Sequence, residues 1–506
     1  MANNFPSSAN NGTSLANNRT TGQAIPPSDH NDLADAQVAV EAKLGIGTSA
    51  PTTVGQVLTV TGAGSSAWQA SAGGTASNPV FLNVKTYGAL GNGAQDDTPY
   101  IQAAINAALA LAQAGTGTVY FPAGQYKITS TLNCSSANNT ASGYGVVLRG
   151  DGHQASQIFK NSSFGPAVEY KGYQGPTFPS QFGGMERISV NCNNTTGGGI
   201  HVVAGQQMFF NSISVLGSAD IGLDLDCTQD SYFNQMTFNN CGSSTKRVIE
   251  IYGSVYGTAN MLWFSQIRVE TYIKGAVYIY RGVGATGGGN NGFFWSQCKF
   301  ENYPTVGGDH FVADSYTQQL DMSQIFISCG IYAAAYSTPS NGIVFGTGGA
   351  SPGNNQAAFR GIYYNAGPTT GIGAAAVKVD GTNMSGAITF DNIQGGSTFT
   401  NGVIDMSNMS GFDTSMTSIA SSGTSALISG DNSGHSARAG VGTFVAGAAT
   451  ITTKRALTSA RITVTPTSTS ASSGIPYIFS ISSGVSFIVK SSNGADANSF
   501  NWAIIN

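Results

Sequence analysis

Two groups of charged side chains stand out in a sequence that contains few of them. Only 9% of the 506 residues are charged, whereas an ordinary soluble domain has roughly a quarter. One group belongs to two short apolar-x-apolar segments and consists of Arg268, Glu270, Lys299 and Glu301. The other group belongs to Ile221-Gly-Leu-Asp-Leu-Asp226 and the related Ile249-Glu-Ile251, and consists of Asp224, Asp226 and Glu250. Both groups offer the paired carboxylates that acid–base catalysis requires.

The first group suits a retaining glycosidase if its two segments lie on neighbouring strands. Glu270 and Glu301 would then be about 5 Å apart, the spacing of a nucleophile and an acid–base residue. Arg268 and Lys299 would lower the pKa values of the carboxyl groups and contact the substrate. The alternative is a surface ion-pair ladder in which the cations make two like charges tolerable.

The second group suits inversion, in which a water molecule separates the two carboxylates. Asp224 and Asp226 alternate with leucines, so both point outward, about 7 Å apart. Alignment of the two segments puts Glu250 beside Asp224 and Tyr278 next to Glu250, where a ring could hold a sugar. The alternatives are solvated edge charges or an acidic patch at a subunit interface. Asp224, Asp226 and Asp230 are conceivable calcium ligands, but no spaced D-x-D-x-D-G loop is present. We expect no metal and no cofactor.

Aromatic residues are dense between residues 272 and 364 and include Trp295. Sugar rings stack on exposed aromatic faces, so Trp295 is a further candidate for substrate binding. Aromatic residues also stack inside β-structures and are buried between subunits. The sequence leaves these interpretations open.

The elements that would position these groups are short repeated strands. One series starts about 23 to 31 residues apart and comprises Ile188-Ser-Val190, Ile213-Ser-Val215, Met236-Thr-Phe238, Ile267-Arg-Val269, Cys298-Lys-Phe300, Ile325-Phe-Ile327 and, after a longer gap that includes Ile362, Ile388-Thr-Phe390. A second series alternates with it and comprises Ile200-His-Val202, Ile221-Gly-Leu223, Ile249-Glu-Ile251, Val277-Tyr-Ile279, Ile343-Val-Phe345 and Val377-Lys-Val379. Strands with this period, two series and no crossover helices predict a parallel β-helix.

A helix is expected just before the repeats. Thr98 can cap it, Pro99 fits its first position, and Asp96 and Asp97 favour its positive end. Its apolar stripe would cover the open end of the coil; the stripe comprises Ile101, Ala104, Ile105, Ala108, Leu109 and Ala112.

The segment that contains this helix, FLNVKTYGALGNGAQDDTPYIQAAINAALA followed by GTVYFPAGQYKITSTL, resembles the opening of the pectate-lyase-like superfamily found in bacteriophage tailspikes. PTTVGQVLTVTGAGSSAWQAS (51–71) resembles a small module of phage fibre and spike proteins. The resemblance implies an all-β fold with a right-handed parallel β-helix. It does not assign a site, because the NTD, GHG and RIK signatures of polygalacturonase-type relatives are missing. Arg268 beside Glu270 is only loosely similar to the arginine base of pectate lyases.

Composition limits the partners. The net charge of −4 and the lack of a basic cluster argue against nucleic acid. No apolar run is long enough to span a membrane, and no signal peptide is apparent at the start. The six cysteines lack CxxC spacing, which favours buried thiols over disulfides or zinc.

We therefore expect three parts. Residues 1–78 would form an attachment arm with a short helix over 29–44, residues 79–430 the β-helix with its capping helix, and residues 437–506 a small β-sandwich-like domain. The resemblance implies a homotrimeric phage spike or fibre, assembled in the host cytoplasm, attached to other virion proteins through residues 1–78 and bound to a host surface glycan. Depolymerase activity, as a glycoside hydrolase or lyase, stays open. The alternatives are a non-catalytic fibre or capsid decoration protein and a stand-alone polysaccharide lyase or hydrolase.

Overall fold

The computed structural model describes residues 56–62, 65–70, 80–112, 117–136, 143–172, 179–285, 289–301, 308–328, 340–347, 354–365, 374–380, 385–396, 399, 401–406, 412–416, 419–421, 428–430, 439–452, 460–467, 473–483 and 486–505. The chain divides into two compact units, Met1–Asn78 and Pro79–Asn506. In the first unit, β1 (Gln56–Gly62) and β2 (Ser65–Ala70) form an antiparallel hairpin. The helix expected over 29–44 lies outside the described residues.

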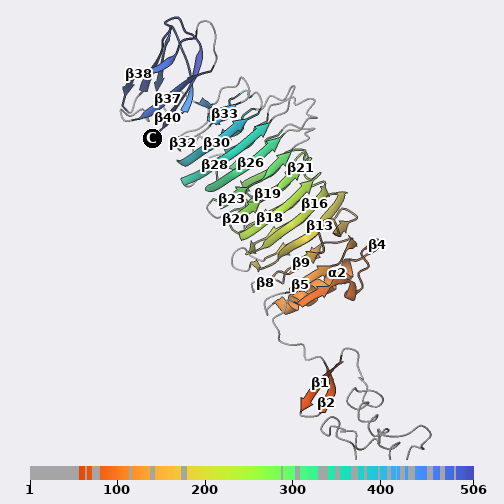
Figure 1. The fold of residues 1–506 in the computed structure, drawn as a ribbon. Coiled ribbons are helices and arrows are strands. Elements are labelled where there is room, and N and C mark those ends of the chain that lie inside the picture. Colours follow the sequence, from red (N-terminus) through yellow and green to blue (C-terminus); the bar gives the residue numbers. More distant parts are fainter. Residues whose placement is uncertain are drawn as a thin grey trace, which may run out of the picture. The chain divides into compact units, whose positions relative to one another are not determined.

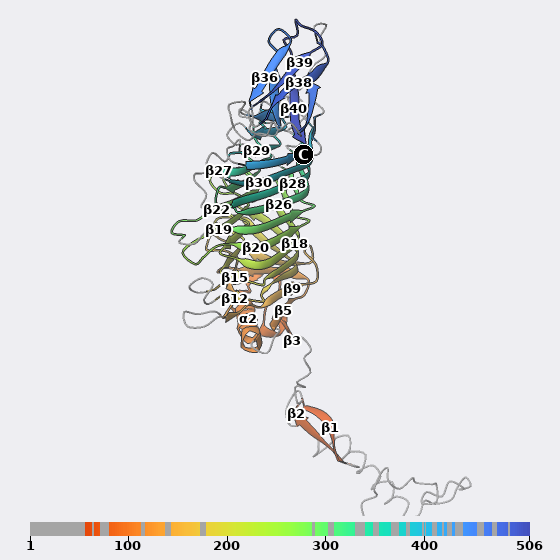
Figure 2. The same ribbon diagram turned by 90° about the vertical axis from the view of Figure 1, so that its left-hand side faces the viewer.

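Most of the second unit is a coil of parallel strands that presents three long faces (Figures 1 and 2). Face A contains β3 (Val80–Asn83), β5 (Gly117–Phe121), β9 (Val147–Gly150), β20 (Asn260–Ser265), β23 (Asn291–Ser296) and β32 (Phe412–Met416). Face B contains β4 (Asn92–Asp96), β6 (Gly124–Ile128), β10 (Ser156–Lys160), β21 (Arg268–Glu270), β24 (Lys299–Glu301) and β33 (Ile419–Ser421). Six longer strands bend across both faces: β13 (Gly184–Thr195), β16 (Phe209–Ser218), β18 (Gln229–Asn239), β26 (Gln319–Ser328), β28 (Asn354–Asn365) and β30 (Ser385–Gly395).

Face C is a separate parallel sheet. It contains β7 (Leu132–Asn133), β11 (Val168–Lys171), β14 (Ile200–Val203), β17 (Leu223–Asp226), β19 (Ile249–Gly253), β22 (Val277–Arg281), β25 (Phe311–Asp314), β27 (Ile343–Thr347), β29 (Val377–Val379), β31 (Ile404–Met406) and β34 (Ile428–Gly430). Three short strands add a ladder that leads into β18: β8 (Gly143–Tyr144), β12 (Ser180–Gln181) and β15 (Gly205–Gln206). From β5 onward the chain thus passes through faces A, B and C in that order on each described rung, and on six rungs one bent strand serves both A and B.

On the rungs from β16 to β30 the bend between faces A and B depends on one residue in the left-handed conformation. Its φ is between +51° and +61° at Ser212, Gln235, Gln266, Gln297, Gln324, Gly361 and Asn392. This conformation is strained for most L-residues. Neighbouring corner side chains also pair, because Gln266 Nε2 donates to Gln297 Oε1 at 3.3 Å. The corner therefore lets a single strand serve two faces.

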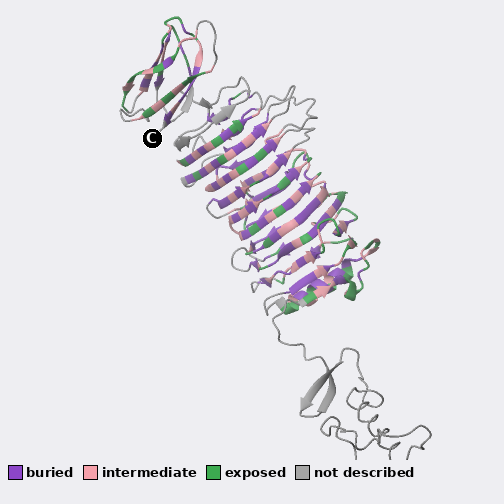
Figure 3. Ribbon diagram, viewed as in Figure 1, coloured by how far each residue is buried: buried purple, intermediate pink, exposed green. Residues whose placement is uncertain are grey.

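The interior is filled by columns of apolar side chains, and buried and exposed residues alternate along the strands (Figure 3). On face A the inward rings stack on one another, with centroids 5.1 Å apart for Phe210 and Phe233, 4.8 Å for Phe233 and Phe264, and 3.9 Å for Phe264 and Trp295. Identical side-chain positions recur every rung, so each ring finds a partner one rung away.

The capping helix α2 (Thr98–Ala112) lies at the amino-terminal end of the coil (Figure 1). Four residues of its predicted stripe, Ile101, Ala104, Ile105 and Ala108, are fully buried. It begins one residue earlier than predicted: Asp97 O accepts the first helical bond, from Ile101 N, and Asp96 Oδ1 accepts from Thr98 N. The Asp97 carboxylate instead receives the N–H groups of Leu90 and Gly91. Both aspartates thus have structural roles, and the 3₁₀ turn η2 (Val84–Tyr87) precedes them.

The carboxy-terminal part folds as two three-stranded antiparallel sheets around their own core of Phe444, Ile451, Phe487, Val489, Phe500, Trp502 and Ile504. One sheet contains β35 (Ala439–Thr443), β40 (Ser499–Ile505) and β37 (Arg461–Pro466). The other contains β36 (Ala448–Thr452), β39 (Ser486–Ser491) and β38 (Pro476–Ser482). The predicted fold class, a parallel β-helix with a short capping helix and a small carboxy-terminal β domain, is confirmed. The described residues include no helix that is both long and apolar enough to cross a bilayer.

The observed strand pairing differs from the two predicted strand series at three places. Ile325 pairs with Ile362, which pairs with Ile393, so Ile388 belongs to face A and not to the first series. In the second series the partner of Ile200 is Leu223 and not Ile221, and Phe311 is a member that the pattern missed. The errors arise because apolar pairs also occur on the neighbouring face or one pair earlier, and the period alone does not separate them.

Candidate functional site

A column of polar side chains runs along the outer side of face C. Glu169, His201, Asp224, Glu250 and Tyr278 are register partners on five successive rungs. Each follows an inward apolar residue of its strand, so the alternation of β-structure directs all five outward. The predicted placement of Asp224 beside Glu250 and of Tyr278 beside Glu250 is confirmed. His201 and Glu169 were missed, although Ile200-His-Val202 belonged to the same series and marked His201 as an outward residue.

Asp224 is held in a poorly hydrated place. Its side chain is 22% exposed, and its Oδ2 lies 3.8 Å from His201 Nε2. Its Oδ1 is buried and finds no hydrogen-bond partner among the described residues. Burial raises the pKa of Asp224 to about 6, although His201 and the Tyr252 hydroxyl oppose the shift. A carboxyl group with this pKa can hold a proton near neutral pH and release it during a reaction.

His201 is oriented from the opposite side by Glu169. His201 Nδ1 is 3.2 Å from Glu169 Oε1, and this contact lowers the pKa of Glu169. Burial lowers the pKa of His201, but Glu169 and Asp224 outweigh burial, so the pKa of the imidazole is raised overall. Glu169, His201 and Asp224 therefore form a chain through which a proton can be held or passed.

Glu250 is 3% exposed and anchored by three donors. Its carboxylate accepts from the Tyr280 hydroxyl at 3.0 Å, Arg247 N at 3.2 Å and Lys246 Nζ at 3.4 Å. The Tyr280 ring stacks on both Tyr252 and Tyr278, with centroids 5.0 and 4.4 Å apart. Glu250 thus fixes one wall of the site.

Asp226 faces the same way as Asp224 but is 7% exposed. Its Oδ1 accepts from Cys227 Sγ at 3.0 Å, and its register partner on the next rung is Tyr252. The expected pair of Asp224 and Asp226 with room for water between them is not an open site, because Asp226 is buried. The titratable register partners of Asp224 are His201 on one neighbouring rung and Glu250 on the other.

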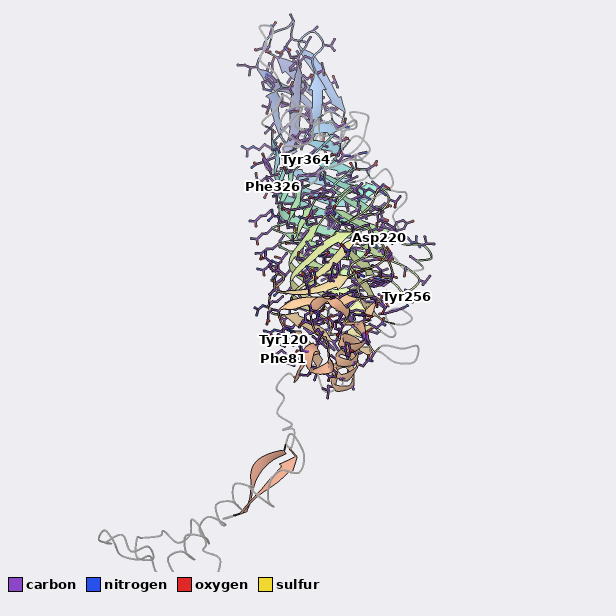
Figure 4. All side chains as sticks on the ribbon, turned by 90° about the vertical axis from the view of Figure 1, so that its right-hand side faces the viewer. Phe81, Tyr120, Asp220, Tyr256, Phe326 and Tyr364 are labelled. Atoms are coloured by element: carbon purple, nitrogen blue, oxygen red, sulfur yellow. The ribbon has the colours of Figure 1, made fainter. Side chains whose placement is uncertain are left out.

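A cavity of about 210 Å³ opens beside His201 and Asp224. Its other lining residues are Pro166, Gly197, Gly198, Ile200, Asp220 and Ile221. The turns between faces B and C therefore form its walls on three successive rungs. Figure 4 shows Asp220 on the side of the coil opposite to Phe326.

The fully buried Lys160 holds these turns together. Its Nζ donates to four carbonyl oxygens, those of Phe164, Gly165, Thr196 and Gly198, at 2.7 to 3.3 Å. Gly197 and Gly198 line the cavity, so the Lys160 ammonium group inside the coil holds the backbone that forms its edge. The sequence contained no signal for this role.

The charged residues on face B form ion pairs with one another. Arg268 is paired with Glu270 on its own rung, and Lys299 with Glu301 at 2.5 Å on the next. Asn239 Nδ2 donates to the remaining Glu270 oxygen at 3.4 Å. The predicted clustering of these four residues is confirmed by the register, and their pairing supports the ion-pair ladder.

Trp295 is not available to a substrate, so this prediction is wrong. Its indole is 1% exposed and lies in the core between Phe264 and Phe311. The outward residues of this strand pair are Trp263 and Phe294. Side chains alternate between the two sides of a strand, so only one ring of Phe294-Trp295 can face inward. Because both residues are aromatic, the sequence pattern alone did not indicate which one.

No cluster of three or more potential metal ligands occurs in the part of the chain that the structure describes. The five described cysteines, at positions 134, 192, 227, 241 and 298, are buried and free, as predicted.

Two segments of the chain match family models. Residues 81–175 match a model described as rhamnogalacturonase A/epimerase, pectate lyase-like. Residues 436–505 match the carboxy-terminal domain of a K1 capsule-specific polysaccharide lyase. Together they cover the capped end of the coil and the terminal β domain, but not the residues of the face C column beyond Glu169.

Relatives and solved structures agree with the fold. The chain is 46% identical over 88 residues to mannuronan C5-epimerase AlgE1 of Azotobacter vinelandii, which is 17% of this chain and 6% of the epimerase. It is 58% identical over 48 residues to AlgE4 of the same organism, 10% of this chain and 8% of AlgE4. ORF18 of Geobacillus virus E2 matches over 84% of this chain and 76% of its own, with a TM-score of 0.54 and 18% identity. The chain thus spans less than a tenth of the curated relatives' length, and the ORF18 likeness shows the fold.

Proposed function

We propose that this chain is a bacteriophage virion protein that binds a host surface polysaccharide and cleaves it at the Asp224 column. One observation carries the proposal: a carboxyl group with a pKa of about 6 faces a cavity together with an imidazole that a second carboxylate orients. Acid–base cleavage of a glycan needs such a proton donor close to the scissile bond. The matches to polysaccharide lyase and epimerase models support the substrate class.

In this proposal Asp224 is the group that gives or takes the proton. His201, held by Glu169, keeps the Asp224 carboxyl close to its working pKa, and Glu250 with its tyrosines forms the wall against which the sugar lies. The ladder at Glu270 and Glu301 has no catalytic role. The cavity next to Asp224 then receives one sugar unit of the polymer.

The virion part of the proposal rests on the resemblance of residues 51–71 and of the segment from Phe81 to phage spike proteins. We propose a homotrimer that is attached to other virion proteins through residues 1–78. A second observation favours a subunit contact on face A. The outward rings of Tyr232, Trp263 and Phe294 stack face to face, so their edges point outward. Sugars stack on ring faces, whereas ring edges pack well against another apolar surface.

The test uses the purified full-length protein and the capsule or lipopolysaccharide of a strain to which the particles adsorb. New reducing ends without a rise in absorbance at 235 nm would indicate hydrolysis, and a rise would indicate elimination. Asp224→Asn should abolish product, whereas Glu270→Gln should leave it unchanged. If product forms, but Asp224→Asn cleaves as fast as the wild type, the assignment of the site is refuted. If no product forms from the glycan of a strain to which the particles adsorb, the proposed cleavage is refuted.

The attachment role is tested separately by deleting residues 1–78. The truncated protein should keep its oligomeric mass in light scattering but no longer enter particles. Incorporation of the truncated protein into particles would refute attachment through residues 1–78. A monomeric full-length protein would refute the proposed homotrimer.

A further inference from the structure

Three cations come together at the turns that lead into face C, directly beside the Asp224 column. Lys246 and Arg247 precede β19, and Lys274 precedes β22 on the next rung. Lys274 Nζ donates to Thr245 O at 2.7 Å, which brings its ammonium group over the turn that carries the other two. Burial lowers the pKa of Lys274, and the charges of Arg247 and Lys246 lower it further. In a chain with 21 lysines and arginines among 506 residues, this is a marked concentration of positive charge.

Arg247 is the unusual member of this cluster. It is 8% exposed, and its guanidinium lies over the Tyr278 ring, with 4.8 Å from Cζ to the ring centroid. Its Nε is buried without a hydrogen-bond partner, and burial lowers the pKa of Arg247, with the charge of Asp309 as the largest opposing effect. Glu250 accepts from the backbone N–H of Arg247 and not from the guanidinium. Burying the Arg247 charge is costly, and an anionic group of a ligand beside the guanidinium would offset that cost.

Three cations on faces A and B have a partner of opposite charge. Arg268, Lys299 and Arg360 each pair with a carboxylate of their own or the neighbouring rung. These pairs neutralise faces A and B locally. Lys246 pairs with Glu250 at 3.4 Å, and Asp309 is the carboxylate that acts most strongly on Arg247, so two carboxylates face the three cations. The cluster therefore keeps an excess of positive charge.

The cluster and the cavity lie along one line parallel to the coil axis. Asp224, Glu250 and Tyr278 are register partners, so the turns at 246–247 and at 274 are one and two rungs beyond the Asp224 strand. Rungs are about 4.8 Å apart. The cavity borders the same turn on the preceding rungs, at Gly198 and Asp220. A polymer lying along this edge would contact the cavity and the cations with neighbouring sugar units.

We propose that Lys246, Arg247 and Lys274 form a subsite for a carboxylate group of the substrate, so that the polysaccharide is acidic. The inference rests on the proposed function, because the subsite is defined relative to the cleavage position at Asp224. The guanidinium fork of Arg247 matches the geometry of a carboxylate, and the two ammonium groups supply charge without fixed direction. The positive subsite also offsets the acidic residues of the column, which would otherwise repel an acidic chain.

The experiment measures binding in the Asp224→Asn background, in which the polymer stays intact. The probes are polygalacturonate and polysialate, each compared with the same polymer after chemical reduction of its carboxyl groups. The test variant is Lys246→Gln with Lys274→Gln. The matched control is Arg268→Gln with Lys299→Gln, which removes the same two charges from face B. Circular dichroism and the melting temperature verify that both double variants are folded.

At least one acidic polymer should bind, with an affinity that falls at least about tenfold on carboxyl reduction and in the test variant, as expected for the loss of charge-assisted hydrogen bonds. The control should bind as the parent does, and affinity should fall with added salt. Equal binding of the reduced polymers, an equal loss in the control, or no binding of either acidic polymer would overturn the inference. Cleavage of a neutral glycan that depends on Asp224 would leave the proposed function standing and refute the subsite. Charge-dependent binding without cleavage by the wild type would support the subsite and refute the proposed cleavage.

Discussion

Replacing Asp224 by Asn should make the protein relatively more stable at high pH than at low pH. The folded state raises the pKa of Asp224 from 3.8 to about 6 because burial disfavours the carboxylate. A raised pKa contributes stability below pH 3.8 that is lost as the pH rises through 6, because the folded state must then hold a desolvated charge. The shift is about 2 units, which corresponds to at most about 3 kcal/mol at 1.36 kcal/mol per unit, and less for a side chain in partial contact with solvent. The asparagine is neutral throughout and avoids this loss.

His201 changes in the same direction, since its pKa is also raised and part of that shift comes from Asp224. For a coil of about 350 residues the entropy of unfolding is roughly 0.7 kcal/mol per kelvin, so 3 kcal/mol corresponds to about 4 °C. We therefore expect the melting temperature of Asp224→Asn, relative to the wild type, to be up to about 4 °C higher at pH 8 than at pH 4. Differential scanning calorimetry at one fixed heating rate measures this difference in melting temperature, and Asp230→Asn serves as the control. Asp230 has a φ of +48°, which asparagine also tolerates. A relative melting temperature that does not change with pH, or that falls at pH 8, would refute the account of Asp224.

Four further predictions follow from the contacts. If Asp224 is the proton donor, glycan cleavage should decline as the pH rises above about 6, the pKa of that group, and a pH-rate profile without an inflection there would contradict this role. Trp295→Ala should cost about 3–5 kcal/mol in chemical denaturation because it opens the core, whereas Trp263→Ala on the outer side of the neighbouring rung should cost about 1 kcal/mol; equal losses would refute the inward and outward assignment. Lys160→Met should destabilise the protein by at least about 2 kcal/mol and reduce cleavage, since four carbonyl groups lose their donor; unchanged stability would show that water replaces the ammonium. Glu270→Gln should change the unfolding free energy by less than about 1 kcal/mol, as for exposed ion pairs, and a larger loss would mean that the face B ladder is more than a surface feature.

Local signals in the sequence were sufficient to predict the β-helical coil. The apolar-x-apolar segments repeat because every rung must fill the same interior positions, so Ile188, Ile213, Met236, Ile267 and Cys298 could be aligned without coordinates. The corner also left a trace that was not used: a glutamine directly precedes the inward residue at Gln235, Gln266, Gln297 and Gln324, and each adopts a positive φ. The helix stripe and the side-by-side placement of Asp224 and Glu250 were equally accessible. All of these depend on residues close in sequence or exactly one repeat apart.

Only the tertiary structure decided which of these residues are chemically available. Trp295 and Asp226 carry suitable groups, but burial removes both from solvent, and burial depends on the phase of each strand and on the turn beside it. The pKa of Asp224 depends on the dielectric surroundings that three stacked turns create, and His201 acquires its partners from the strands on either side. Lys160 and Arg247 act through contacts with rungs that are far away in sequence. The sequence repeat determined the coil because each rung places apolar residues at the same interior positions. The site arises from differences between rungs, and their effect on burial and pKa depends on contacts that form only when the rungs stack.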